Sequence, residues 1–147
     1  MRYRKWFLLG MFLVGVFAPA ISSVHAQTIT SFDAPGSTGT FPQSINPRGE
    51  ITGYYNDSGG VGHGFVRDQR GTFTSFDVIP FGINPAGEIT GSEGAGHGFV
   101  RDQRGTITSF DPPGSIGTSP VSINPRGEIT GWYIDSGGLF HGFVRSR

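Results

Sequence analysis

The sequence predicts an all-β fold of three four-stranded antiparallel repeat units, arranged like the blades of a β-propeller. Three observations favour this class. A motif of the form (S/G)INPxGEITG occurs three times, at residues 44–53, 82–91 and 122–131. Each copy is followed by the sequence HGFVR, and Gly or Pro interrupts every stretch that could otherwise form a helix. Repetition of this kind indicates a supersecondary unit that stacks on its neighbours.

Residues 1–26 predict a secretory signal peptide. Arg2, Arg4 and Lys5 precede an almost unbroken apolar run at 6–18, and Val-His-Ala at 24–26 resembles a cleavage site. The apolar run is short for a membrane span, although an uncleaved signal anchor is the alternative. We therefore expect a secreted or periplasmic protein.

Cleavage after residue 26 would leave a β-repeat domain at 27–147. This segment contains all 11 acidic residues, 8 of the 11 basic residues and no Cys, so its formal charge is about −3. Nucleic acid and anionic membrane surfaces favour clustered basic residues, and we expect neither as a partner. Without disulfides, the domain must be held together by packing between its repeats.

The repeat units are expected at 28–71, 72–105 and 106–147, from the recurrence of the TxTSFD sequence. In the first full unit, strands are predicted at about 41–46, 50–56, 62–68 and 72–77. Asn-Pro-Arg-Gly at 46–49 places Pro and Gly where a hairpin turn needs them. Both faces of these strands carry bulky side chains, as expected for a sheet between two neighbouring sheets.

The chain begins with a fourth-strand sequence and ends on a third strand. Residues 28–33 are therefore predicted to pair beside residues 141–145 and to complete the last unit, as in propellers that close between their termini. Propellers typically have four to eight blades. Two chains forming a six-bladed homodimer, a β-trefoil or β-prism closure, and a fragment of a longer array are the alternatives.

The repeated motifs, INxxGxITG followed by HGFV and a TxTSFD strand, resemble the HAF family of extracellular repeat proteins. The resemblance covers residues 28–147, although the second unit lacks the PGS segment and the equivalents of 56–60. It implies bacterial export and propeller-like β-architecture. It supplies no catalytic residues.

Repeated polar residues are expected to stabilise the fold, and we assign no catalytic residue, metal ligand or cofactor. One histidine per unit precedes Gly-Phe, and we expect it to be buried and bonded to a backbone or carboxylate group rather than to zinc; these are His63, His97 and His141. Carboxylates beside turns are expected to accept backbone hydrogen bonds rather than to hydrolyse glycosides; these are Asp33, Asp77, Asp111, Glu50, Glu88 and Glu128.

The candidate ligand-binding residues are aromatic. Tyr54 and Tyr55 in the first unit correspond to Trp132 and Tyr133 in the third. They precede a loop on the edge where all variation in repeat length occurs, and such loops often carry recognition. We expect a non-catalytic binding or scaffold module for a glycan or protein ligand. The alternatives are a lectin-like glycan-binding domain, a hydrolase that uses the repeated carboxylates, and packing of these aromatic residues between sheets.

Overall fold

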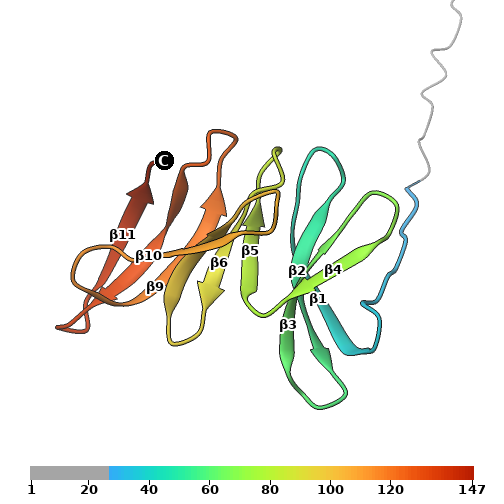
Figure 1. The fold of residues 1–147 in the computed structure, drawn as a ribbon, viewed down its shortest axis with the longest axis horizontal. Helices are drawn as coiled ribbons and strands as arrows, with labels where there is room; N and C mark the ends of the chain where they lie inside the picture. The colour runs from blue at the N-terminus through green and yellow to red at the C-terminus, as the bar shows by residue number, and fades with distance from the viewer. Residues whose placement is uncertain (1–26) are drawn as a thin grey trace, which may run out of the picture. The chain divides into compact units, whose positions relative to one another are not determined.

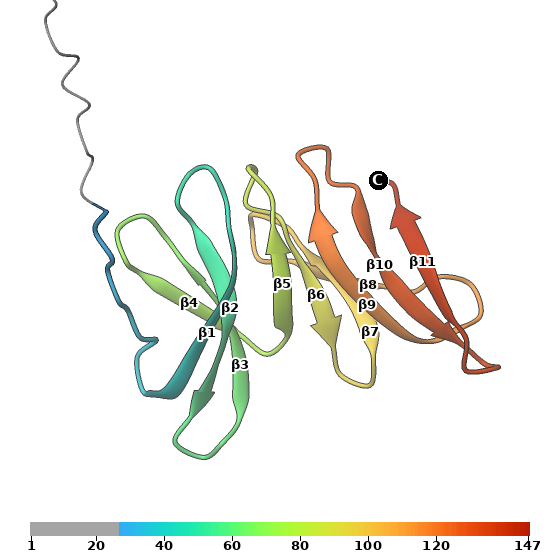
Figure 2. The same ribbon diagram turned by 180° about the vertical axis from the view of Figure 1, so that it is seen from behind.

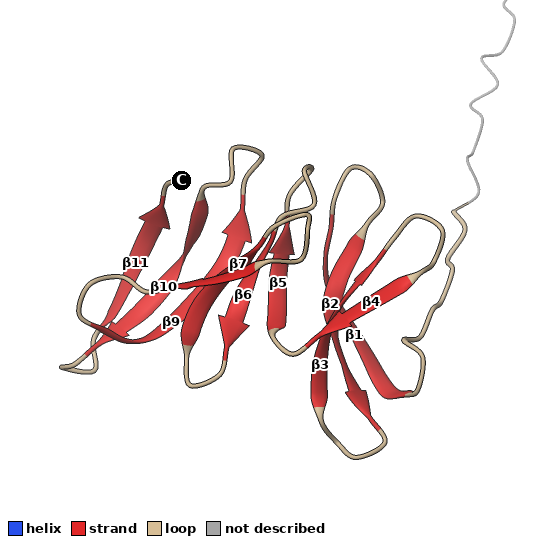
Figure 3. Ribbon diagram, viewed as in Figure 1, coloured by secondary structure: helices blue, strands red, loops and turns tan. Residues whose placement is uncertain are grey.

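The computed structural model describes residues 27–147, and the predicted signal peptide lies outside the described residues. Every described strand belongs to one compact unit, Phe32–Arg147. This unit consists of strands and connecting loops, and no helix is present in the described part of the chain (Figure 3). The prediction of an all-β antiparallel fold is confirmed.

Eleven strands in the described residues form three antiparallel sheets, each in sequence order (Figure 1). The first sheet contains β1 (Ser37–Ile45), β2 (Ile51–Asp57), β3 (Gly62–Arg67) and β4 (Phe73–Phe76). The second sheet contains β5 (Ile79–Ile83), β6 (Ile89–Glu93), β7 (His97–Arg101) and β8 (Ile107–Phe110). The third sheet contains β9 (Ser115–Ile123), β10 (Ile129–Asp135) and β11 (Phe140–Arg145).

The predicted turns have the expected chemistry. Gly49 has a φ of 76°, and its N–H donates to the carbonyl of Asn46 at 2.9 Å. This left-handed conformation favours glycine, and Pro47 at the second turn position has a φ that suits the turn. The same backbone bond recurs in the other two NPxG turns. These short hairpins fix the antiparallel pairing of the first two strands of each sheet.

The predicted strand at 28–33 is not formed, and the third sheet has three strands instead of four. The order of that sheet is β11-β10-β9, so β11 has one paired edge. Phe32 instead contacts the first sheet: its ring centroid lies 6.1 Å from that of Phe73 and 4.8 Å from Cζ of Arg67. The expectation that 28–33 completes the last unit of the same chain is therefore wrong for this structure. Closure of the sheets into a propeller stays a prediction.

Each sheet has two distinct faces, because side chains alternate along a strand. In the first sheet, Thr52 and Val66 are paired across β2 and β3 and lie on one face, which we call the threonine face. Phe65 and Arg67 lie on the opposite face, which we call the arginine face. In the second sheet, Thr90 and Val100 lie on the threonine face, and Phe99 and Arg101 lie on the arginine face. In the third sheet, Thr130 and Val144 lie on the threonine face, and Phe143 and Arg145 lie on the arginine face.

The threonine face of one sheet packs on the arginine face of the next. Val66 and Phe76 of the first sheet contact a buried cluster in and beside the second sheet, which contains Val78, Ile83, Ile89 and Phe99. Phe110 of the second sheet similarly lies 5.9 Å from Phe143 of the third sheet, in an edge-on arrangement. The middle sheet is thus covered on both faces, whereas the first sheet, on which the two-sided pattern of bulky residues was read, is covered on its threonine face only (Figure 1, Figure 2). Burial at these two junctions provides the apolar core.

The last glycine of each GEITG sequence is explained by close approach of the neighbouring strand. A Cβ atom at Gly91 would overlap the carbonyl oxygen of Ile79 and lie 2.7 Å from Cα of Pro80. A register shift between Pro80 and Gly82 brings this backbone against β6. A side chain at this position would force the strands apart, so the sequence uses glycine.

Candidate functional site

The three repeated histidines lie at one edge of their sheets, beside carboxylates. Nε2 of His63 lies 3.2 Å from Oδ2 of Asp57, and its Nδ1 lies 3.6 Å from Oδ1 of Asp77. In the third sheet, Nε2 of His141 lies 3.0 Å from Oδ2 of Asp135. The expected carboxylate partners are therefore present. The expected burial is wrong, because all three histidine side chains are partly exposed.

The second sheet builds its histidine pair differently, because its shorter β6–β7 loop lacks an equivalent of Asp57. Nδ1 of His97 lies 2.6 Å from Oδ2 of Asp111, and the hydroxyl of Thr118 donates to Asp111 at 2.5 Å. Thr118 belongs to β9, so this polar group joins the second sheet to the third. Each histidine is held by groups of its own sheet and the adjoining loop.

In the second sheet, the contact between His97 and Asp111 shifts the pKa values of both partners. The hydrogen bond with Asp111, and then the charge of that carboxylate, raise the pKa of His97. Burial raises the pKa of Asp111, but bonds from Thr118 and His97 outweigh it and hold the pKa below its ordinary value. The backbone N–H of Val61, followed by the ring of His63, lowers the pKa of Asp57. These shifts favour the ionised forms of Asp57, Asp111 and His97.

We expect the contribution of the His97–Asp111 pair to depend on pH. Since the pKa of His97 is raised above its ordinary 6.5, this contribution is complete below pH 6.5 and is lost as the pH rises through the folded-state pKa. Since the pKa of Asp111 is lowered from 3.8, its contribution is complete above pH 3.8 and is lost as the pH falls through the folded-state pKa. Wild type should therefore exceed His97→Gln in free energy of unfolding by more at about pH 5 than at about pH 8.

Urea unfolding at both pH values checks this expectation, and an NMR titration of the imidazole gives the pKa directly. In the control Asp111→Asn, the pKa of His97 should return towards its ordinary value. A His97 pKa that is the same in wild type and Asp111→Asn would contradict the assignment.

The four aromatic candidates do not form one site. Tyr54 and Trp132 lie on the threonine faces of the first and third sheets, whereas Tyr55 and Tyr133 lie on the arginine faces beside histidines. Tyr54 stacks on Phe41 with ring centroids 4.9 Å apart. The rings of Tyr55 and Tyr133 lie 5.2 and 5.0 Å from the histidines of their own sheets. Three of the four side chains thus make contacts within their own sheet and are partly buried.

Trp132 is the candidate with the most open surroundings. Its side chain is 41 % exposed and lies 5.3 Å from the ring of Phe140, which is 68 % exposed. Val144, on the same face of the third sheet, is 73 % exposed. Contiguous exposed apolar residues mark surfaces that bind other molecules. This patch of Trp132, Phe140 and Val144 is called the open threonine face below.

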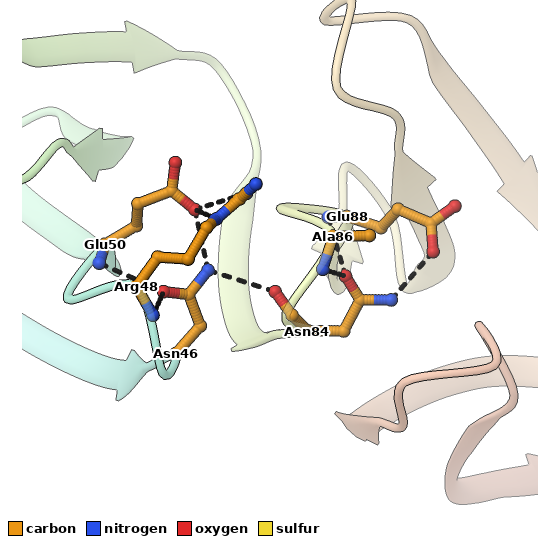
Figure 4. Close-up of polar contacts among 6 residues, drawn as sticks. All are labelled: Asn46, Arg48, Glu50, Asn84, Ala86 and Glu88. Atoms are coloured by element: carbon orange, nitrogen blue, oxygen red, sulfur yellow. Dashed lines mark hydrogen bonds and ion pairs between the residues drawn. The ribbon is translucent and has the colours of Figure 1, made fainter.

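The glutamates of the GEITG sequences belong to polar turns at the opposite edge from the histidines. In the middle sheet, Oδ1 of Asn84 accepts hydrogen bonds from the N–H groups of Ala86 and Glu88 at 3.0 and 2.9 Å. Its Nδ2 donates to Oε2 of Glu88 at 2.7 Å (Figure 4). The first and third sheets repeat this arrangement. The repeated glutamates therefore accept from asparagine side chains, rather than from the backbone as expected.

The asparagines also connect one sheet to the next. Nδ2 of Asn46 donates to the carbonyl of Asn84 at 3.1 Å, as Figure 4 shows, and Nδ2 of Asn84 donates to the carbonyl of Asn124 at 3.2 Å. We call this series the asparagine ladder. Sequence reasoning treated these residues only as turn formers. The recurrence of Asn and Glu four residues apart was the available signal, but the bond between sheets depends on how the sheets stack.

The remaining predicted carboxylates differ from one another. Asp77 is almost fully exposed, and Asp111 is bound to two side chains. Asp33 is exposed and precedes the first strand. Within residues 27–147, no cluster of three or more histidine, cysteine, aspartate or glutamate side chains has metal-binding geometry. Nor does that part of the chain contain a helix with the length and hydropathy of a membrane span.

Comparison with known proteins gives no match to a protein-family model, a curated protein or a solved structure. The similarity of the repeats to HAF repeats therefore stays a prediction.

Proposed function

We propose that this protein is a non-catalytic binding module, and that its binding surface is the open threonine face of the third sheet. One observation carries the proposal. The first two sheets bury their threonine faces against the next sheet, with Thr52 and Thr90 fully buried, whereas the equivalent Thr130 is exposed beside Trp132 and Val144. A face built for close packing is thus left open to a partner.

The chemistry of the face favours a protein partner. Its prominent side chains are an indole, a phenyl ring and a branched aliphatic group, which gain free energy when a complementary apolar surface removes them from water. Sugar recognition would add polar groups around an aromatic platform, and beside Trp132 this face offers the short hydroxyl side chains of Thr130 and Ser119 and no charged or amide group of β10 or β11. The hydrolase alternative gains little support, because the repeated glutamates already bond asparagines.

Val144→Asp should weaken binding through this face, because it places a charge within an apolar contact. We expect affinity for a protein partner to fall at least about tenfold. The chain from Gln27 contains one tryptophan, Trp132, so its fluorescence reports binding at this face. Peptide and glycan arrays probed with wild type and Val144→Asp measure the effect. Val61→Asp is the matched control, because Val61 is 55 % exposed in the β2–β3 turn.

Trp132→Ala should weaken the same binding without unfolding the protein, since the indole is partly exposed. Ligands that bind Val144→Asp and wild type equally would contradict the proposal. Glycan binding that is lost in Trp132→Ala would favour the lectin-like alternative over a protein partner.

A further inference from the structure

We propose that the partner is a second copy of this chain, bound head to tail. In this arrangement, the threonine face of the third sheet of one copy covers the arginine face of the first sheet of the next copy. Residues 28–33 of that next copy then add a fourth strand beside β11. The inference rests on the proposed function, since it uses the same open threonine face.

The two outer faces are the threonine face of the third sheet and the arginine face of the first sheet. Within the chain, a threonine face packs on an arginine face at both junctions between sheets. Ile83 and Ile123, on the arginine faces of the second and third sheets, are each 7 % exposed, whereas the equivalent Ile45 of the first sheet is 65 % exposed. Val144 is likewise open, whereas Val66 packs into the first junction. The arginine face of the first sheet therefore has no threonine face packed on it, and the threonine face of the third sheet has no arginine face packed on it. Each open face is of the kind that the other one lacks as a partner.

The glycine of each HGFVR sequence also indicates that the threonine face of the third sheet has no neighbouring sheet. A Cβ atom at Gly98 would lie 2.9 Å from Cγ of Pro120 in the next sheet, so the third sheet approaches it closely. At Gly142, the nearest atom to such a Cβ is 3.9 Å away and belongs to the same sheet. A proline of a following first strand, such as Pro42 of another copy, has room at this position.

The asparagine ladder also ends at these faces. The Nδ2 of each asparagine donates to the glutamate of its own turn, and in Asn46 and Asn84 it also donates to the carbonyl of the next asparagine. Among the described residues, no further sheet offers Asn124 a carbonyl. The carbonyl of Asn46 in a second copy would continue the ladder with the geometry of the two existing bonds. This polar register would align the two copies.

The free edge of β11 is suited to a strand that the chain itself contains. A cavity of about 420 Å³ is lined by Gly142, Phe143, Val144 and Arg145, together with residues of the β8–β9 connection. Their equivalents on β7 pair with β8, which lies within residues 106–111. Residues 28–33 have the same sequence, TITSFD, as 106–111. An open strand edge of this kind readily accepts a matching strand.

Phe32 contacts the arginine face of the first sheet in the same way as the phenylalanines of β4 and β8 contact the arginine faces of the second and third sheets. Its ring lies 4.8 Å from Cζ of Arg67, compared with 5.1 Å for Phe76 and Arg101 and 4.7 Å for Phe110 and Arg145. In the latter two pairs, the phenylalanine belongs to the fourth strand of the preceding sheet. The sheet that precedes the first sheet is then supplied by another copy. The middle sheet separates the first sheet from the chain's own β11 (Figure 2).

Light scattering coupled to size exclusion tests this assembly on the full-length chain and on the chain from Gln27. Wild type should have a concentration-dependent mass of two or more copies, and Val144→Asp and Ile45→Asp should each be monomeric. A mixture of these two variants should form one-to-one complexes, because each retains the face that the other lacks. Val61→Asp should behave like wild type. Circular dichroism checks that every variant is folded.

The added strand is tested by the double substitution of Thr30→Pro and Ser31→Pro. Adjacent amides point to opposite sides of a strand, so one of the two prolines removes a donor that faces β11. These residues lie outside the compact unit. Self-association should weaken at least about tenfold, while Gln27→Pro should leave it unchanged.

A folded wild-type chain that stays monomeric at about 0.5 mM, or a variant mixture that does not associate, would overturn self-assembly. If an array ligand is nevertheless lost in Val144→Asp, the proposed binding module stands with a different partner. If Val144→Asp affects neither self-association nor any ligand, both proposals fail.

Discussion

Phe99→Ala should lower the free energy of unfolding by about 4 kcal/mol, the largest effect expected of any substitution considered. The ring is fully buried in the middle sheet, where it packs with Val78, Ile83 and Ile89. Its removal forfeits apolar burial and leaves a cavity that the surrounding strands cannot close. Urea unfolding followed by circular dichroism measures the loss.

The matched control for Phe99 is Phe143→Ala at the equivalent position of the third sheet. That ring is partly exposed and lies in the last sheet, so we expect a loss of about 2 kcal/mol. Equal losses at the two positions in monomeric protein would show that the junctions are equally buried. That result would contradict the packing described above.

Asn84→Ala should lower the free energy of unfolding by about 3 kcal/mol. The side chain is fully buried, and it accepts two backbone bonds and donates one bond to Glu88 and one to the carbonyl of Asn124. The substitution leaves those backbone donors, and the largely buried Glu88 carboxylate, without this partner. Removal of one side of a buried polar network costs more than the net value of its bonds.

Asn124→Ala is the control for the asparagine ladder, because it removes the same turn bonds at a half-buried position. It should cost about 1 kcal/mol in the monomer, since water can replace the lost partners. Equivalent costs at Asn84 and Asn124 would show that the bond between sheets adds no stability.

The sequence was sufficient to predict the local structure, because local chemistry decides it. Proline and glycine in the NPxG turns determine the hairpins, and β-forming residues between them determine the strands. The predicted strands at 50–56 and 62–68 overlap β2 and β3 closely, whereas β1 begins at Ser37, before the predicted start at 41. The two-sided pattern, read on the first unit, predicted a sheet covered on both faces; the middle sheet is covered in this way, whereas the arginine face of the first sheet is open at Ile45.

The sequence was not sufficient to place the N-terminal segment. TITSFD at 28–33 has the composition of a fourth strand, but composition does not specify which β-strand edge it joins. The contact of Phe32 with Arg67 places its end at the first sheet instead of at β11. Long-range pairing of this kind depends on how the sheets stack, and repeated units offer several equivalent edges.

The candidate site was only partly predictable for a similar reason. The repeat alignment grouped Tyr54 with Trp132, but the two side chains differ in their surroundings because one belongs to the first sheet and one to the last. Tyr54 stacks on Phe41, whereas Trp132 lies on an open face beside Phe140. The equivalent of Phe41 in the third sheet is Ser119, so this stacking partner is absent there. A single substitution in the repeat thus contributes to an open surface.

Amide hydrogen exchange measured across protein concentrations tests the central claim most directly. At low concentration, the amides of β11 should exchange much faster than those of β7, which is paired on both edges. As the concentration rises, residues 28–33 and β11 should become protected together, because each completes a sheet of another copy. Protection of both segments that is already complete in dilute monomer would contradict this account, since it would mean that each chain closes on itself.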